Sequence, residues 1–140
     1  MADLFTHSLD VRYLEVDQQG VVFNMWYLAY FDDAMTAFLE HGGLTYEDMV
    51  AAGYDVQLVH ASVDWRGGVG WRDDVRIAVS LARAGRTSFT LDFQVLRAGT
   101  DVVDGRIVYV VVAPDGGGKV EIPPLLRDAL GEERPLRPLP

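Results

Sequence analysis

The sequence predicts an α+β fold in which a curved antiparallel sheet wraps around one long central helix. Near the start of the chain, one segment repeats apolar residues at helical spacing around most of its circumference. Segments with strand-like alternation lie before and after it. When a sheet with one apolar face packs against a single apolar helix, each covers the apolar surface of the other. We therefore expect one domain over residues 1–131, followed by a flexible tail over residues 132–140.

The expected helix covers residues 24–40, and a strand over residues 4–15 precedes it. Only a narrow polar stripe interrupts the apolar surface of this helix, so we expect it to be buried on most sides. Gly42 and Gly43 supply its end. Thr45 follows with a hydroxyl that can cap a short second helix.

Four further strands are expected over residues 55–65, 74–83, 86–97 and 102–113. The first of them changes phase near Leu58, which indicates a β-bulge. The last is an almost uninterrupted run of valine and isoleucine, as in strands that are covered on both faces. A dimer that joins two sheets edge to edge would supply this additional burial.

The composition excludes several kinds of protein. A formal net charge of −9 disfavours non-specific binding to nucleic acid, which needs a basic surface. The absence of cysteine excludes disulfides, thiolate metal sites and a cysteine nucleophile. No basic segment followed by an apolar block opens the chain, and its apolar runs are of strand length. We therefore expect a cytoplasmic protein with no membrane span.

A turn before the long helix carries the strongest functional signal. It contains Asp17 and Gly20, and the helix begins a few residues later. The amide end of a helix favours the ionised form of a nearby carboxylate. Such a carboxylate can attack an acyl carbon or take a proton from water, while free N–H groups stabilise the oxyanion. On the residues alone, a purely structural role in the turn is as good an interpretation of Asp17.

The turn and the helix together carry a recognisable pattern. Its residues are Asp17, Gly20, Val21, Val22, Tyr27, Leu28, Tyr30, Phe31 and Asp32. This pattern resembles the hotdog-fold acyl-CoA thioesterases of the 4-hydroxybenzoyl-CoA thioesterase-like branch. The resemblance implies a hotdog fold, hydrolysis of an acyl-CoA to the free acid and coenzyme A, and Asp17 as nucleophile or general base. It also implies that the backbone N–H near Asn24 polarises the thioester carbonyl. Relatives commonly carry His or Tyr at the position of Asn24, and a backbone role would survive that difference.

The resemblance further implies a homodimer or homotetramer in which two subunits build each site, with no metal and no cofactor besides the coenzyme A of the substrate. Two groups of residues are expected to bind that substrate. The first surrounds the turn and consists of Gly20, Val22, Phe23, Trp26 and Tyr27. The second lies on a hairpin, where it would meet the nucleotide phosphates, and consists of Arg83, Arg86, Thr87 and Ser88. Aromatic residues that could line an acyl pocket are Phe23, Trp26, Tyr27, Trp65 and Trp71. Their abundance near the turn favours an aromatic or medium-chain acyl group.

Alternatives remain open at this point. Glu15 could be a second acid or base, and Asp32 or Asp33 on the helix could replace Asp17 as the catalytic carboxylate. The same fold could serve a non-catalytic acyl-CoA-binding protein. It could also serve a thioesterase that acts on an acyl-carrier protein, although an acidic surface would repel an acidic carrier.

Overall fold

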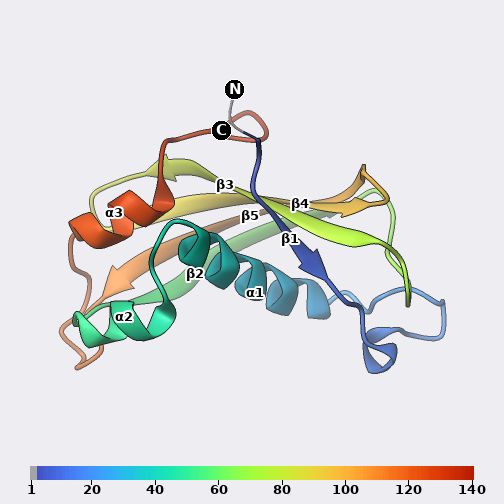
Figure 1. Ribbon diagram of the computed structural model, residues 1–140, viewed down its shortest axis with the longest axis horizontal. Coiled ribbons are helices and arrows are strands. Elements are labelled where there is room, and N and C mark those ends of the chain that lie inside the picture. Colours follow the sequence, from blue (N-terminus) through green and yellow to red (C-terminus); the bar gives the residue numbers. More distant parts are fainter. Residues whose placement is uncertain (1–2) are drawn as a thin grey trace.

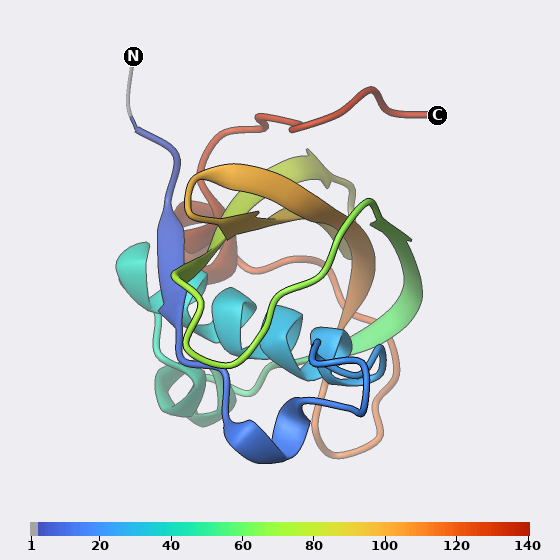
Figure 2. The same ribbon diagram turned by 90° about the vertical axis from the view of Figure 1, so that its right-hand side faces the viewer.

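A computed structural model describes residues 3–140. Five antiparallel strands form one sheet in the order β1-β3-β4-β5-β2, and the sheet arches over the long helix α1 (Figures 1 and 2). The strands are β1 (Thr6–Leu9), β2 (Asp55–Trp65), β3 (Val75–Ala84), β4 (Ser88–Arg97) and β5 (Thr100–Val112). The helices are η1 (Tyr13–Glu15), α1 (Trp26–His41), α2 (Tyr46–Ala51) and α3 (Pro124–Leu130). None of the helices in this described part is long and apolar enough to cross a bilayer.

The first predicted strand is much shorter than expected. It ends at Leu9, and the chain then turns through the 3-10 helix η1. The side chain of Glu15 accepts a hydrogen bond from the backbone N–H of Arg12, which closes this helical turn. A strand to residue 15 would put Tyr13 on the same face as Leu9 and Val11, which are buried, but Tyr13 is 72% exposed. The prediction of a strand to residue 15 was therefore wrong, because a local side-chain contact replaces sheet pairing.

Helix α1 lies close against the inner face of the sheet. Phe31 is fully buried, and its ring centroid lies 4.7 Å from that of Phe93 on β4. A Cβ placed on Gly105 of β5 would lie 2.7 Å from Cε2 of Phe31. The glycine therefore sets how near the helix can approach β5. As predicted, Thr45 caps α2, since its hydroxyl accepts a hydrogen bond from the N–H of Asp48 at 3.1 Å.

Strand β2 forms one edge of the sheet. It pairs with β5, and its register shifts between Leu58 and His60, which confirms the predicted bulge. Within residues 3–140, its other edge has no strand beside it. Leu58 and Val59 are 44% and 53% exposed along this strand. A long free edge with exposed apolar side chains is a surface on which another strand can pair.

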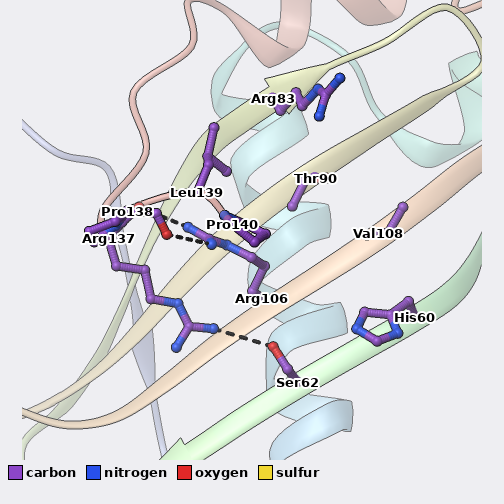
Figure 3. Close-up of a pocket in the computed structure, with 10 residues that line it drawn as sticks. All are labelled: His60, Ser62, Arg83, Thr90, Arg106, Val108, Arg137, Pro138, Leu139 and Pro140. Carbon is purple, nitrogen blue, oxygen red and sulfur yellow. Dashed lines mark hydrogen bonds between the residues drawn. The ribbon is translucent and has the colours of Figure 1, made fainter.

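We expected residues 132–140 to form a flexible tail. They lie along the outer face of the sheet, the face turned away from α1 (Figure 2). There the guanidinium of Arg106 donates to the carbonyls of Arg137 and Pro138 and also pairs with the buried carboxylate of Asp92. Figure 3 shows the hydrogen bonds from Arg106 to the carbonyls of Arg137 and Pro138 beside a surface hollow, together with a hydrogen bond from Arg137 to Ser62. How mobile the tail is stays a prediction.

Candidate active site

The predicted turn lies at the tip of a narrow two-stranded ribbon, and Asp17 is the first residue of the turn. The N–H of Asp17 donates to the carbonyl of Val21 at 2.9 Å, and the N–H of Gly20 donates back to the carbonyl of Asp17 at 3.0 Å. Gly20 has a φ of +80°, a conformation that glycine adopts without strain. One carboxylate oxygen of Asp17 accepts the N–H of Gln19 at 2.8 Å. We call residues 17–21 the Asp17 turn.

The limbs of the ribbon connect this turn to the start of α1. Val16 pairs with Val22, and the N–H of Phe23 donates to the carbonyl of Glu15 at 2.9 Å. Val22 is 2% exposed and belongs to the core. The ribbon therefore ties the backbone of the Asp17 turn to Phe23, the residue that leads into the helix.

The amide end of α1 is open. Trp26 and Tyr27 donate their N–H groups to the carbonyls of Phe23 and Asn24. In the part of the chain that the structure describes, the N–H groups of Asn24 and Met25 have no acceptor, and no side chain caps the helix. Such N–H groups carry the partial positive charge of the helix dipole and can receive an oxyanion.

A hollow of about 440 Å³ lies directly beside this open end. It is formed by the start of α1 and by the inward face of β2, and we call it the α1–β2 hollow. Its lining residues are Phe23, Asn24, Met25, Tyr27, Leu28, Ala61, Val63 and Trp65. The rings of Tyr27 and Trp65 meet edge to face at a centroid distance of 5.7 Å. Burial raises the pKa of Tyr27, so this phenol stays neutral at ordinary pH.

The structure brings together only some of the site residues predicted around the turn. Phe23, Asn24 and Tyr27 line the hollow, whereas Val22 is buried in the core. Trp26 faces a different hollow, where the guanidinium of Arg12 lies 5.8 Å from its ring centroid. Asp17 and Gly20 are half-buried and exposed, respectively, and neither lines the α1–β2 hollow within one chain.

The predicted phosphate-binding hairpin lies at the other end of the sheet. Ser88 of the hairpin pairs with Val110 of β5, and Val110 pairs in turn with Gln57 near the start of β2. Trp65, which lines the hollow, is the last residue of β2. Eight residues of strand separate the two positions, which is about 26 Å. Arg86 makes one long ion pair with Glu121, at 3.6 Å, and both side chains are exposed. A single chain therefore does not bring the hairpin to the hollow.

Sequence reasoning missed four lining residues, namely Met25, Leu28, Ala61 and Val63. Their signal was present: Met25 and Leu28 are apolar residues at the very start of the predicted helix, and both are exposed in the structure. Ala61, Val63 and Trp65 alternate on one face of β2. Alternation alone does not reveal that this strand lies at the sheet edge, beside the amide end of α1.

The rival carboxylates lie elsewhere. Glu15 is buried and bonded to Arg12 and Tyr30, away from the α1–β2 hollow. Asp32 and Asp33 lie in the second turn of α1. Partial burial, followed by the charge of Asp33, raises the pKa of Asp32. Both residues are remote from the free N–H groups. A substrate carbonyl beside either of them would therefore lack those hydrogen-bond donors to stabilise its oxyanion.

Comparisons with known proteins agree with this fold. A family model described as the thioesterase-like superfamily matches residues 11–130. A solved hypothetical protein from Aquifex aeolicus is 26% identical with a TM-score of 0.85, covering 91% of this chain and 99% of that one. The PA5185 protein from Pseudomonas aeruginosa strain PAO1 is 29% identical with a TM-score of 0.82, covering 91% and 89%. A 1,4-dihydroxy-2-naphthoyl-CoA thioesterase from Synechocystis is 21% identical with a TM-score of 0.81, covering 91% and 96%. The chain has the hotdog fold and belongs to the thioesterase-like superfamily.

Proposed function

We propose that this protein hydrolyses an acyl-CoA thioester at the amide end of α1. The observation that carries the proposal is the pair of free N–H groups at Asn24 and Met25, which open beside an apolar hollow and next to a carboxylate turn. The acyl group would occupy the α1–β2 hollow. Its carbonyl oxygen would accept hydrogen bonds from the helix start, where developing negative charge is stabilised.

Asp17 would act on the carbonyl carbon in one of two ways. As a general base, it takes a proton from water, and the hydroxide adds to the carbon. As a nucleophile, it adds directly and forms a mixed anhydride, which water then hydrolyses. In both routes the C–S bond breaks, the sulfur leaves with the electron pair and is protonated to the thiol of coenzyme A, and the acid is released.

A second copy of the chain would complete the site. The free edge of β2 and its exposed Leu58 and Val59 suit antiparallel pairing with the same strand of a partner. Two antiparallel copies of β2 would bring the far end of one sheet toward the hollow of the other. The hairpin that bears Arg83 and Arg86 would then approach from the partner and meet the phosphates of coenzyme A.

The lining of the hollow supports an apolar acyl group. The rings of Phe23, Tyr27 and Trp65, with Met25 and Leu28, offer wide apolar contact and few polar groups. A hollow of about 440 Å³ has the size of a small-ligand site. We therefore propose aromatic or medium-chain acyl groups as the preferred substrates.

The proposal is tested by the release of free thiol from aromatic, short-chain, medium-chain and long-chain acyl-CoAs and from an acylated acyl-carrier protein, with binding followed by calorimetry. We expect saturable hydrolysis that is fastest for aromatic or medium-chain members. Saturable binding without thiol release would indicate a non-catalytic acyl-CoA-binding protein. Release only from acyl-carrier protein would indicate a carrier thioesterase instead.

A further inference from the structure

We infer that Glu15 is a positioning residue that fixes the Asp17 turn to helix α1. The inference rests on the proposed function, because it assigns Glu15 the task of aligning a carboxylate and an oxyanion site on one carbonyl. Glu15 does not touch the substrate in this account. It acts through the backbone of the ribbon and through the side chain of Tyr30.

The carboxylate of Glu15 is enclosed and fully bonded. Only 4% of the residue is exposed. One oxygen accepts the backbone N–H of Arg12 at 2.8 Å and the hydroxyl of Tyr30 at 2.9 Å. The other accepts Nε and Nη2 of Arg12 at 3.1 and 3.0 Å. Four donors therefore hold the carboxylate in one orientation, and the charge-assisted bonds among them are the strong ones.

The backbone of Glu15 also bonds to the limb of the ribbon that leads from the Asp17 turn into α1. Its carbonyl accepts the N–H of Phe23, the residue immediately before the free N–H of Asn24. Its side chain meets Tyr30, a residue of α1 that is 3% exposed. Glu15 thus joins three segments: η1, the limb that leads into the helix, and the helix itself. Asp17 follows only two residues later, so its position relative to the amide end depends on this junction.

The surroundings of Glu15 argue against direct acid–base chemistry. It borders a separate hollow together with Arg12, Trp26 and Tyr30, and does not line the α1–β2 hollow. Burial alone would raise the pKa of Glu15, but the hydrogen bonds from Arg12 and Tyr30 outweigh it and hold that pKa below its usual value. A carboxylate held ionised by four donors is a poor proton carrier and a good structural anchor.

Loosening this junction should affect catalysis more than binding. Misplacement of a catalytic group by about 1 Å can cost on the order of 10²-fold in rate. The acyl group contacts other residues, so substrate binding should persist. We expect Tyr30→Phe and Glu15→Gln to lower kcat by about 10-fold to 100-fold while KM changes by no more than about 3-fold.

A matched control is available on the opposite face of the sheet. Asp92 is another buried carboxylate, 1% exposed, and is paired with Arg106 at 2.6 Å. Asp92→Asn removes a comparable charge from a comparable ion pair without touching the ribbon. It should lower the thermal midpoint and leave kcat unchanged, so loss of stability alone can be separated from loss of positioning.

The experiment measures kcat, KM, the thermal midpoint and amide hydrogen exchange for wild type and the three variants. We expect faster exchange at Gly20 and Phe23 in Tyr30→Phe and Glu15→Gln, with no change there in Asp92→Asn. The inference is overturned if the folded Tyr30→Phe variant keeps wild-type kcat, or if its exchange at these amides is unchanged. It is also overturned if Asp92→Asn lowers kcat equally. An inactive wild type would refute the proposed function, whereas the exchange measurement would still decide the role of Glu15.

Discussion

Substitution of Gly105 by alanine tests how closely α1 approaches the sheet. The added Cβ would lie 2.7 Å from Cε2 and 2.9 Å from Cζ of Phe31, distances that real Cβ contacts essentially never show. Phe31 is fully buried and its ring packs against Phe93, so it has little room to move. The helix or the strand must shift to accept the methyl group.

Overpacking of this kind costs about 1–3 kcal/mol. Alanine also restricts the unfolded chain more than glycine does, and this effect raises the free energy of unfolding by roughly 0.4–1 kcal/mol. Taking the middle of each range, we expect a net loss of about 1–2 kcal/mol in the free energy of unfolding. For a chain of this size, that loss lowers the thermal midpoint by about 3–8 °C.

Denaturant unfolding of Gly105→Ala, Phe31→Leu and the double variant measures the contact directly. Leucine lacks the distal ring atoms that the new methyl group would meet, so the double variant should lose less stability than the sum of the two single variants. Gly67→Ala is the control, because its Cβ would meet only Val102 at 3.4 Å, an ordinary contact. Additive losses, or an unchanged Gly105→Ala, would refute the close approach of α1 to β5.

Two further predictions concern buried polar groups. The hydroxyl of Tyr109 is buried and has no hydrogen-bond partner among residues 3–140. Tyr109→Phe should therefore leave the free energy of unfolding unchanged or raise it by up to about 1 kcal/mol, and a clear loss in denaturant unfolding would contradict this. Burial, followed by the proximity of Asp104, raises the pKa of Asp101 to about 6, above its ordinary value of 3.8. Because this pKa is higher in the folded state than in the unfolded state, the folded state binds the proton of Asp101 more tightly. Ionisation of Asp101 therefore lowers the free energy of unfolding above pH 6, and this loss disappears as the pH falls toward 4. Asp101→Asn should raise the thermal midpoint at pH 7.5 and match wild type near pH 4, and a lower midpoint at pH 7.5 would show that the pairing of Asp101 with Arg66 dominates.

The sequence predicted the sheet and the long helix well because their side-chain periods are strong and their apolar faces are wide. The phase change in β2 even located the bulge near Leu58. The first strand was predicted too long because the contact of Glu15 with Arg12, rather than periodicity, decides the chain path there. A local polar contact of this kind has no periodic signature.

The sequence predicted what kind of site this is, but only some of the residues that line it. The carboxylate turn, Asn24 and the aromatic residues beside it follow from their order along the chain. Trp26 was grouped with Phe23 and Tyr27, but the helical rotation between neighbouring residues sends it to another side of α1. Val63 and Trp65 reach the hollow only because β2 returns beside the start of α1. That proximity depends on the sheet order, which no local pattern encodes.

The role of Asp17 in hydrolysis is tested by comparing wild type with Asp17→Asn in two assays, acyl-CoA binding and thiol release. Asp128→Asn is the control, since it makes the same chemical change at an exposed carboxylate on α3. We predict that Asp17→Asn binds acyl-CoA with nearly wild-type affinity and loses about 10²–10⁴-fold in kcat, while Asp128→Asn matches wild type in both assays. Thiol release by Asp17→Asn at the wild-type rate would show that Asp17 is not the catalytic carboxylate.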